Sequence, residues 1–149
     1  MRGFTLIELI IVVAIIMLLG ALSVPFFQSF QVSSGLYTFT DEVSRIVRYA
    51  QVSAINGQNN DDWGVYFNES NKEYTIYKGS NYALRDTNFD LVFEYREIFS
   101  ISTDFVNDEI IFSQYQGLPQ SSGTITITSV NNNTYQIDIS NIGLINVSY

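Results

Sequence analysis

The chain has 149 residues, and its seven basic and fifteen acidic side chains give a formal net charge of -8 at pH 7. That charge repels phosphate backbones, so we expect no nucleic-acid partner. Cysteine and histidine are both absent, which excludes disulfides and thiolate zinc sites and removes the commonest general base. We therefore expect no enzyme, no cofactor and no metal site, in a chain long enough for one soluble domain after a membrane segment.

An almost wholly apolar run occupies residues 4–27. As a helix rising about 1.5 Å per residue it is about 35 Å long, and the hydrocarbon core of a bilayer is about 30 Å thick. The run therefore predicts a single membrane-spanning helix. Arg2 precedes it and the next basic residue is Arg45, which places the N-terminus in the cytoplasm and the rest of the chain outside the membrane.

One acidic residue, Glu8, lies inside this apolar run. A charge at the bilayer centre costs about 2.5–3.5 kcal/mol, so the carboxylate needs an interfacial position, a proton or a cationic partner. In one interpretation Glu8 reaches the headgroups and interacts favourably with the N-terminal end of the helix dipole. In the other its partner is Arg2, a free α-amino group made by processing, or a cation of another chain.

The residues around Glu8 resemble a known family. The run Arg2-Gly3-Phe4-Thr5-Leu6-Ile7-Glu8-Leu9 is similar to the start of the prepilins and pseudopilins of type IV pili, type II secretion and competence systems. The resemblance implies cleavage after Gly3 by the prepilin peptidase, N-methylation of Phe4, and pairing of Glu8 with the Phe4 amine of a neighbouring subunit. The expected partners are other pilin or pseudopilin subunits, the peptidase, the membrane protein of the assembly platform, and lipid of the cytoplasmic membrane.

Two residues predict a bend in the helix. Pro25, at a place where many members of the family carry a proline, removes one backbone hydrogen bond, and Gly20 loosens the same region.

Two other interpretations of the N-terminus are a secretory signal cleaved near Ala21-Leu22-Ser23 and the plain signal anchor of an unrelated surface protein. The single basic residue before the run, the length of the run and Glu8 disfavour a secretory signal.

Residues 28–57 predict an amphipathic continuation of the helix. After a polar stretch, apolar residues recur at steps of three and four: Leu36, Phe39, Val43, Ile46, Val47, Ala50 and Ala54. We expect this stripe to pack against a sheet. The pair Asn56-Gly57 predicts the end of the helix, which is about 80 Å long if Gly35 does not interrupt it.

Residues 58–149 predict a β-rich head. Strands are expected at residues 63–67, 74–77, 91–95, 98–101, 110–112, 124–128, 135–139 and 144–147. The first two form a hairpin, and residues 124–128 and 135–139 alternate strictly, so they should pair with one face buried. The predicted fold class is α+β and pilin-like. A long N-terminal helix, membrane-spanning in its first half and amphipathic in its second, packs on one antiparallel sheet or two small ones. The resemblance to prepilins implies that residues 1–3 are a leader peptide.

Short motifs in the head resemble one branch of the family, the H-type minor pseudopilins of type II secretion and the FimT-like minor pilins. They lie at residues 48–54 followed by Asn56-Gly57, and at residues 63–67, 111–112, 117–119, 123–125 and 139–143. This resemblance implies a structural subunit that primes or caps a filament. The subunit would lie first in the cytoplasmic membrane and then in a periplasmic pseudopilus or an extracellular pilus.

Two alternatives to a scaffold role stay open. One is an adhesive or DNA-uptake tip pilin that binds its ligand through exposed loops such as residues 82–88. Arg96 is the last basic residue of the chain, which disfavours DNA. The other is a monomeric, membrane-anchored surface domain. The acidic turns at residues 60–62 and 104–109 do not match the EF-hand pattern, and we expect them to be solvated.

Overall fold

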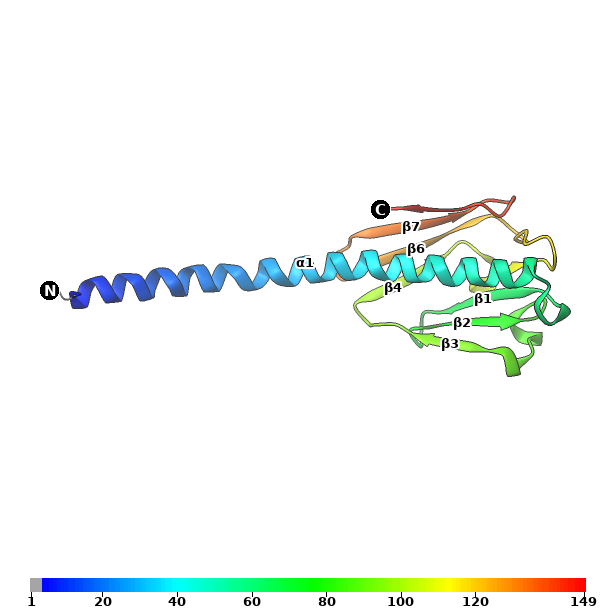
Figure 1. The fold of residues 1–149 in the computed structure, drawn as a ribbon, viewed down its shortest axis with the longest axis horizontal. Helices are drawn as coiled ribbons and strands as arrows, with labels where there is room; N and C mark the ends of the chain where they lie inside the picture. The colour runs from blue at the N-terminus through cyan, green and yellow to red at the C-terminus, as the bar shows by residue number, and fades with distance from the viewer. Residues whose placement is uncertain (1–3) are drawn as a thin grey trace.

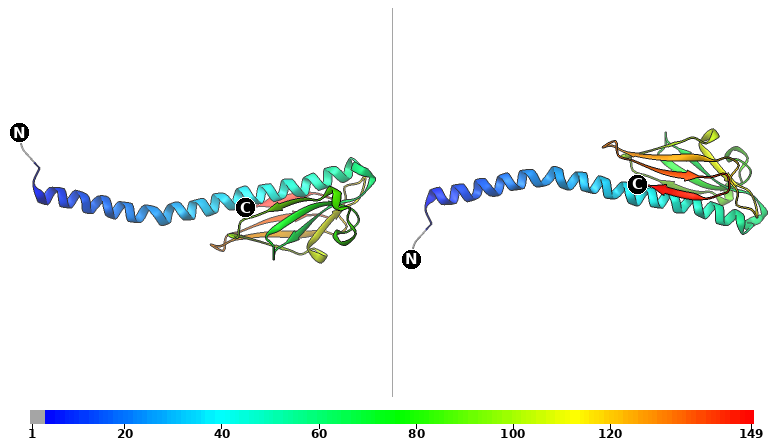
Figure 2. Two further views of the ribbon diagram at one scale, coloured as in Figure 1. Left: turned by 90° about the horizontal axis from the view of Figure 1, so that it is seen from below. Right: turned by 90° about the horizontal axis from the view of Figure 1, so that it is seen from above.

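The computed structural model describes residues 4–149, together with their side chains except those of residues 22–26 and 28. One long helix, α1 (Leu6–Ile55), carries two antiparallel sheets on its C-terminal half, while its N-terminal half extends away from them (Figures 1 and 2). The predicted α+β class, with a long N-terminal helix against an antiparallel head, is confirmed. Of the two expected arrangements of the head, one sheet or two small ones, the structure has two small sheets.

Helix α1 is a single element of 50 residues, about 75 Å long. It is helical through Gly20, Pro25 and Gly35, so Gly35 does not interrupt it. A Cβ at Gly35 would lie 3.3 Å from the ring of Phe99, so glycine there permits a close approach of the sheet to the helix. Figure 2 shows α1 curving gently. The side chain of Pro25 lies outside the described residues, and a bend caused by Pro25 and Gly20 stays a prediction.

The end of α1 agrees with the prediction from Asn56-Gly57. Asn56 is the C-cap: its N–H donates to the carbonyl of Val52, and the N–H of Gly57 donates to the carbonyl of Ala54, both at 2.9 Å. Gly57 then adopts a left-handed conformation, with φ of 59°, which glycine reaches without steric cost. A short turn, η1 (Gln58–Asn60), leads from there into the first strand.

The eight strands form two separate four-stranded sheets. The first has the order β3 (Leu91–Glu94), β2 (Glu73–Lys78), β1 (Trp63–Asn68) and β5 (Glu109–Phe112). The second has the order β4 (Phe99–Thr103), β6 (Gly123–Ser129), β7 (Thr134–Ile139) and β8 (Ile145–Ser148). Short helices η2 (Tyr82–Leu84), η3 (Thr87–Phe89) and η4 (Val106–Asp108) lie in the connections. All eight expected strands are found within a few residues of their predicted positions, including the β1–β2 hairpin and the β6–β7 pair.

The core lies between the second half of α1 and the two sheets. The predicted stripe on α1 is buried there, with Ile46 at its partly buried margin. The strands contribute alternate residues, as in β6 and β7, where Ile125, Ile127, Ile137 and Ile139 are buried and the residues between them are not. One apolar stripe of the helix therefore packs against both sheets.

The C-terminal part of α1 is also joined to the head by polar contacts. The side-chain amide of Gln51 donates to the carbonyl oxygens of Gly117, at 3.1 Å, and Gly143, at 2.7 Å. One turn earlier, the Arg48 guanidinium donates to the carbonyl of Ile145 at 2.7 Å. These bonds fix the chain before β6 and the start of β8 to the helix.

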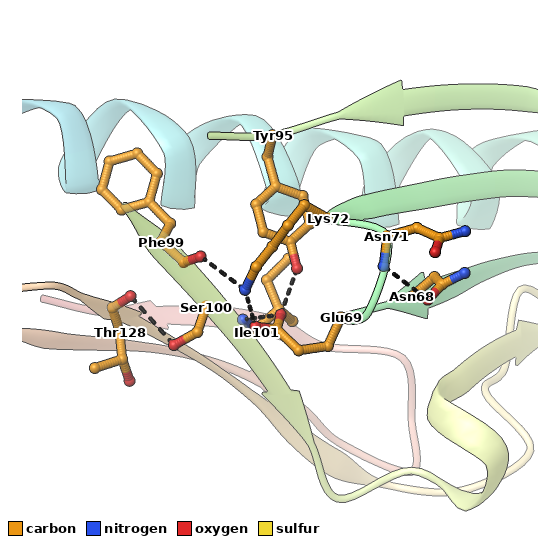
Figure 3. A network of polar contacts seen from close by, with 9 residues as sticks. All are labelled: Asn68, Glu69, Asn71, Lys72, Tyr95, Phe99, Ser100, Ile101 and Thr128. Carbon is orange, nitrogen blue, oxygen red and sulfur yellow. Dashed lines mark hydrogen bonds and ion pairs between the residues drawn. The ribbon is translucent and has the colours of Figure 1, made fainter. Parts of the chain in front are cut away.

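A second polar contact joins the two sheets to each other (Figure 3). Glu69, in the β1–β2 turn of the first sheet, accepts a hydrogen bond from the backbone N–H of Ile101 at 2.9 Å. Ile101 belongs to β4, the edge strand of the second sheet. The carboxylate therefore accepts a hydrogen bond from a backbone N–H that has no partner strand. The hydroxyl of Tyr95 and the ammonium of Lys72 bind the same carboxylate.

This network lowers the pKa of Glu69. Burial would raise the pKa of the carboxyl, but hydrogen bonds from Lys72, Tyr95 and Ile101 and the charge of Lys72 hold it below its ordinary value of 4.5. Burial and the Glu69 carboxylate raise the pKa of the Tyr95 hydroxyl, which therefore remains a donor. The charged form of Glu69 is the form that stabilises the head.

We expect Glu69→Gln to lower the free energy of unfolding at neutral pH by roughly 1 kcal/mol, because Glu69 is partly exposed. A pKa depressed in the folded state gives stability that is present above the unfolded pKa and lost as pH falls through the folded one. The difference between wild type and variant, measured by denaturant unfolding of the full chain in detergent, should therefore shrink below about pH 4. Glu97→Gln, at an exposed carboxylate, is the control. An equal difference at neutral and acidic pH would contradict the assignment.

Candidate functional site

The N-terminal half of α1 presents apolar side chains around its whole circumference. Every large apolar side chain from Phe4 to Leu19 is exposed, with exposed fractions between 40% and 80%. A helix that is apolar all round is normally buried in a protein or a membrane, and an exposed apolar surface of this extent marks an interaction site. This segment therefore needs a cover that the rest of the described chain does not supply.

Among the residues that the structure describes, no helical segment combines the length and hydropathy that a membrane crossing requires. Insertion of residues 4–27 into a membrane stays a prediction.

Glu8 takes part in a capping box at the start of this helix, where Thr5 is the N-cap. The Thr5 hydroxyl accepts from the backbone N–H of Glu8, and the Glu8 carboxylate accepts from the backbone N–H of Thr5, both at 3.4 Å. Each bond satisfies a donor of the first turn that has no partner within the helix. This motif was not predicted, although Thr5-Leu6-Ile7-Glu8 has the required spacing.

The capping box places the predicted assembly residues together. Phe4 directly precedes the cap, and its side chain is exposed. The Glu8 carboxylate is held beside the N–H of the next residue, Thr5, on the outside of the helix end. Gly3 lies outside the described residues. The arrangement presents one carboxylate at the tip of an otherwise apolar rod.

The acidic turns of the head are engaged in internal hydrogen bonds. The Glu109 carboxylate accepts from the Tyr77 hydroxyl at 2.6 Å and from the backbone N–H of Tyr82 at 2.7 Å. Burial, together with Glu109, raises the pKa of Tyr77, so its hydroxyl stays protonated. Asp62 accepts from the backbone of Gln114 at 2.7 Å. Within residues 4–149, no three carboxylates converge on a geometry that could hold a metal ion.

Residues 82–88 form the loop that was expected to bind a ligand in an adhesive or DNA-binding head. Arg85 is the only cation of this loop, and it already has partners within the head. The Arg85 guanidinium donates to Asp90 and to the carbonyl of Tyr82, both at 2.8 Å, and lies 3.7 Å from the centre of the Tyr82 ring. Binding a phosphate there would require breaking this pair. The structure gives an adhesive or DNA-binding role no additional support.

Comparison with known proteins gives a motif and a fold. Residues 1–24 match the prokaryotic N-terminal methylation motif. The minor pseudopilin EpsH of the Vibrio cholerae type 2 secretion system has a similar structure, with a TM-score of 0.58 at 8% identity over 76% of this chain and 94% of that one. The type IV minor pilin FimU of Pseudomonas aeruginosa has a TM-score of 0.60 at 14% identity over 80% and 92%. No curated protein matches the sequence.

The chain is therefore pilin-like: it has a pilin fold and carries a prepilin methylation motif at its start. Both solved structures are minor subunits, one from a secretion system and one from a type IV pilus. This agrees with the resemblance to minor pseudopilins and minor pilins that the sequence shows.

The capping box predicts that Thr5→Ala will weaken the first turn of α1 by about 1 kcal/mol, the usual cost of losing a threonine N-cap. Hydrogen exchange of the full chain in detergent should show faster exchange of the Glu8 amide and unchanged protection in the head. Thr38→Ala is a matched control, because the Thr38 hydroxyl bonds to the Ser34 carbonyl within the helix. Equal exchange at residue 8 in both variants would show that the cap contributes nothing.

Proposed function

We propose that this chain is a minor pilin or pseudopilin, a structural subunit that primes or caps a type IV pilus or a type II secretion pseudopilus. Residues 4–27 anchor it in the cytoplasmic membrane with the N-terminus inside and the head outside. The prepilin peptidase cleaves after Gly3, and the amine of Phe4 is methylated. The subunit then joins other pilin or pseudopilin subunits at the platform protein. Its role is structural and not enzymatic.

The observation that carries this proposal is an exposed apolar rod with a single carboxylate at its tip. The apolar surface can be covered first by lipid and then by the equivalent helices of other subunits, which gives one segment two successive surroundings. An unpaired charge in lipid costs about 2.5–3.5 kcal/mol at the bilayer centre, and pairing with a cation offsets that cost.

Cleavage after Gly3 supplies such a cation. The new amine belongs to Phe4, which directly precedes the capping box where Glu8 is held. Three residues, Thr5 to Ile7, separate Phe4 from Glu8 in the chain, and the hydrogen bond from the Thr5 N–H holds the Glu8 carboxylate near the start of the helix. A neighbouring subunit that lies beside this helix start would then place its own amine next to this Glu8.

Processing can be tested by mass spectrometry of the chain from cells with and without the prepilin peptidase. We expect residues 4–149 with one added methyl group when the peptidase is present, and an uncleaved N-terminus when it is absent. Gly3→Val is a matched variant that should stay uncleaved in both. An intact Met1 in wild-type cells, or cleavage after Ser23, would overturn the proposal.

Assembly can be tested separately with Glu8→Ala. We expect normal cleavage and methylation but filament incorporation reduced at least tenfold, since the loss of the pair corresponds to about 2 kcal/mol or more. Thr5→Ala is the control, because it removes the cap and keeps the carboxylate, so it should assemble almost normally. Normal incorporation of Glu8→Ala, or equal failure of both variants, would refute pairing as the role of Glu8.

A further inference from the structure

The end of the head that faces the N-terminal half of α1 contains an open notch. It has a volume of about 710 Å³ and lies between α1 and two connections of the head, the one from β3 to β4 and the turn from β6 to β7. Its lining includes Ser29, Gln31 and Val32 from the helix and Arg96, Ile98 and Val130 from the head. Figure 1 shows both connections at the end of the head nearest the N-terminus.

The position of this notch along α1 gives its depth relative to a membrane. Gln31 follows Phe27, the last residue of the apolar run, by four residues, which is about 6 Å along a helix. The headgroup layer extends about 5–7 Å beyond each face of the hydrocarbon core. If residues 4–27 span that core, as proposed above, the notch opens at the level of the phospholipid headgroups.

Arg96 is the cation at this level, and its side chain is exposed. The other lysines and arginines of residues 4–149 have partners: Arg45 with Asp41, Lys72 with Glu69, Lys78 with Asp61 and Asp86, Arg85 with Asp90, and Arg48 with a backbone carbonyl. No hydrogen bond or ion pair joins the Arg96 guanidinium to another described residue. Its planar fork of donors suits two oxygens of a phosphate.

Two apolar side chains of the head line the notch beside Arg96, together with the polar Asn131. Val130, in the β6–β7 turn, has an exposed fraction of 59%, and Ile98 is partly exposed. A cation next to exposed apolar side chains fits the boundary between headgroups and acyl chains, where arginine reaches the phosphates and apolar groups lie below it.

We propose that this notch docks on the membrane surface, with the Arg96 guanidinium binding phosphate oxygens of phospholipid headgroups and Val130 contacting the layer beneath them. The inference rests on the membrane anchoring proposed above. The net charge of the chain opposes wider contact with anionic lipid, and Glu97 is exposed next to Arg96. The contact is therefore local and reversible, and it orients the head on the bilayer before assembly.

Because the chain has no cysteine, single cysteines can carry a fluorophore without further changes. The full chain would be placed in vesicles of phosphatidylethanolamine with a minor fraction of phosphatidylglycerol and a headgroup-attached quencher. Asn133→Cys labels the β6–β7 turn, Leu84→Cys the opposite end of the head, and Met17→Cys the apolar helix. We expect strong quenching at residue 133, little at residue 84, and protection of residue 17 from a water-soluble quencher.

The role of Arg96 is tested by Arg96→Gln in the Asn133→Cys chain. We expect the ratio of docked to undocked heads to fall about fivefold, which corresponds to about 1 kcal/mol for one arginine at a membrane surface. Raising the salt concentration should weaken docking of the wild type and have little effect on the variant. Arg45→Gln removes the same charge from the exposed side of α1 and should leave quenching unchanged.

Equal quenching at residues 133 and 84, with residue 17 protected, would overturn the docking and leave the membrane anchor intact. Equal effects of Arg96→Gln and Arg45→Gln on quenching at residue 133 would also overturn the docking. Unchanged quenching combined with impaired filament incorporation of Arg96→Gln would assign Arg96 to an acidic group of a neighbouring subunit. Free access of the water-soluble quencher to residue 17 would overturn the anchor itself and the docking with it.

Discussion

The two halves of a single continuous helix need different surroundings for their apolar side chains. The placement of the other elements follows from this difference. The second half of the helix carries a continuous apolar stripe, and that stripe is covered by two sheets of the same chain. Its first half is apolar all round, and no sheet extends along it (Figure 1). Burial of apolar surface is the dominant favourable term in folding and association, so the first half needs a cover from outside the described chain. In the function proposed above, lipid and then other subunits supply that cover.

The two sheets share no strand, so their relative position depends on side chains. Apolar residues of both sheets pack on the helix, and the Glu69 carboxylate joins the β1–β2 turn to the free edge of β4. A charged hydrogen bond at an edge strand also blocks pairing with a strand of another chain. The same contact thus holds the head together and protects one of its edges.

Periodicity along the chain predicts much of this fold. The stripe from Leu36 to Ala54, the helix end at Asn56-Gly57 and the strict alternation in residues 124–128 and 135–139 are local patterns, and the structure confirms each of them. The role of Glu69 was not predictable in this way, because Ile101 is 32 residues away in the sequence. An acidic residue in a turn is normally expected to be solvated. The capping box at Thr5 is a local pattern that the spacing of Thr5 and Glu8 could have predicted.

The bonds from Gln51 and Arg48 to the two loops have a mechanical consequence. Figure 1 shows the strands lying lengthwise beside α1, and these bonds fix the far part of the helix to the head. A pull on the N-terminal end of α1 therefore loads the contact between helix and sheets in shear. Many contacts must then break together, whereas a perpendicular pull would open them one after another. The head is attached in the orientation that best resists tension along the helix axis.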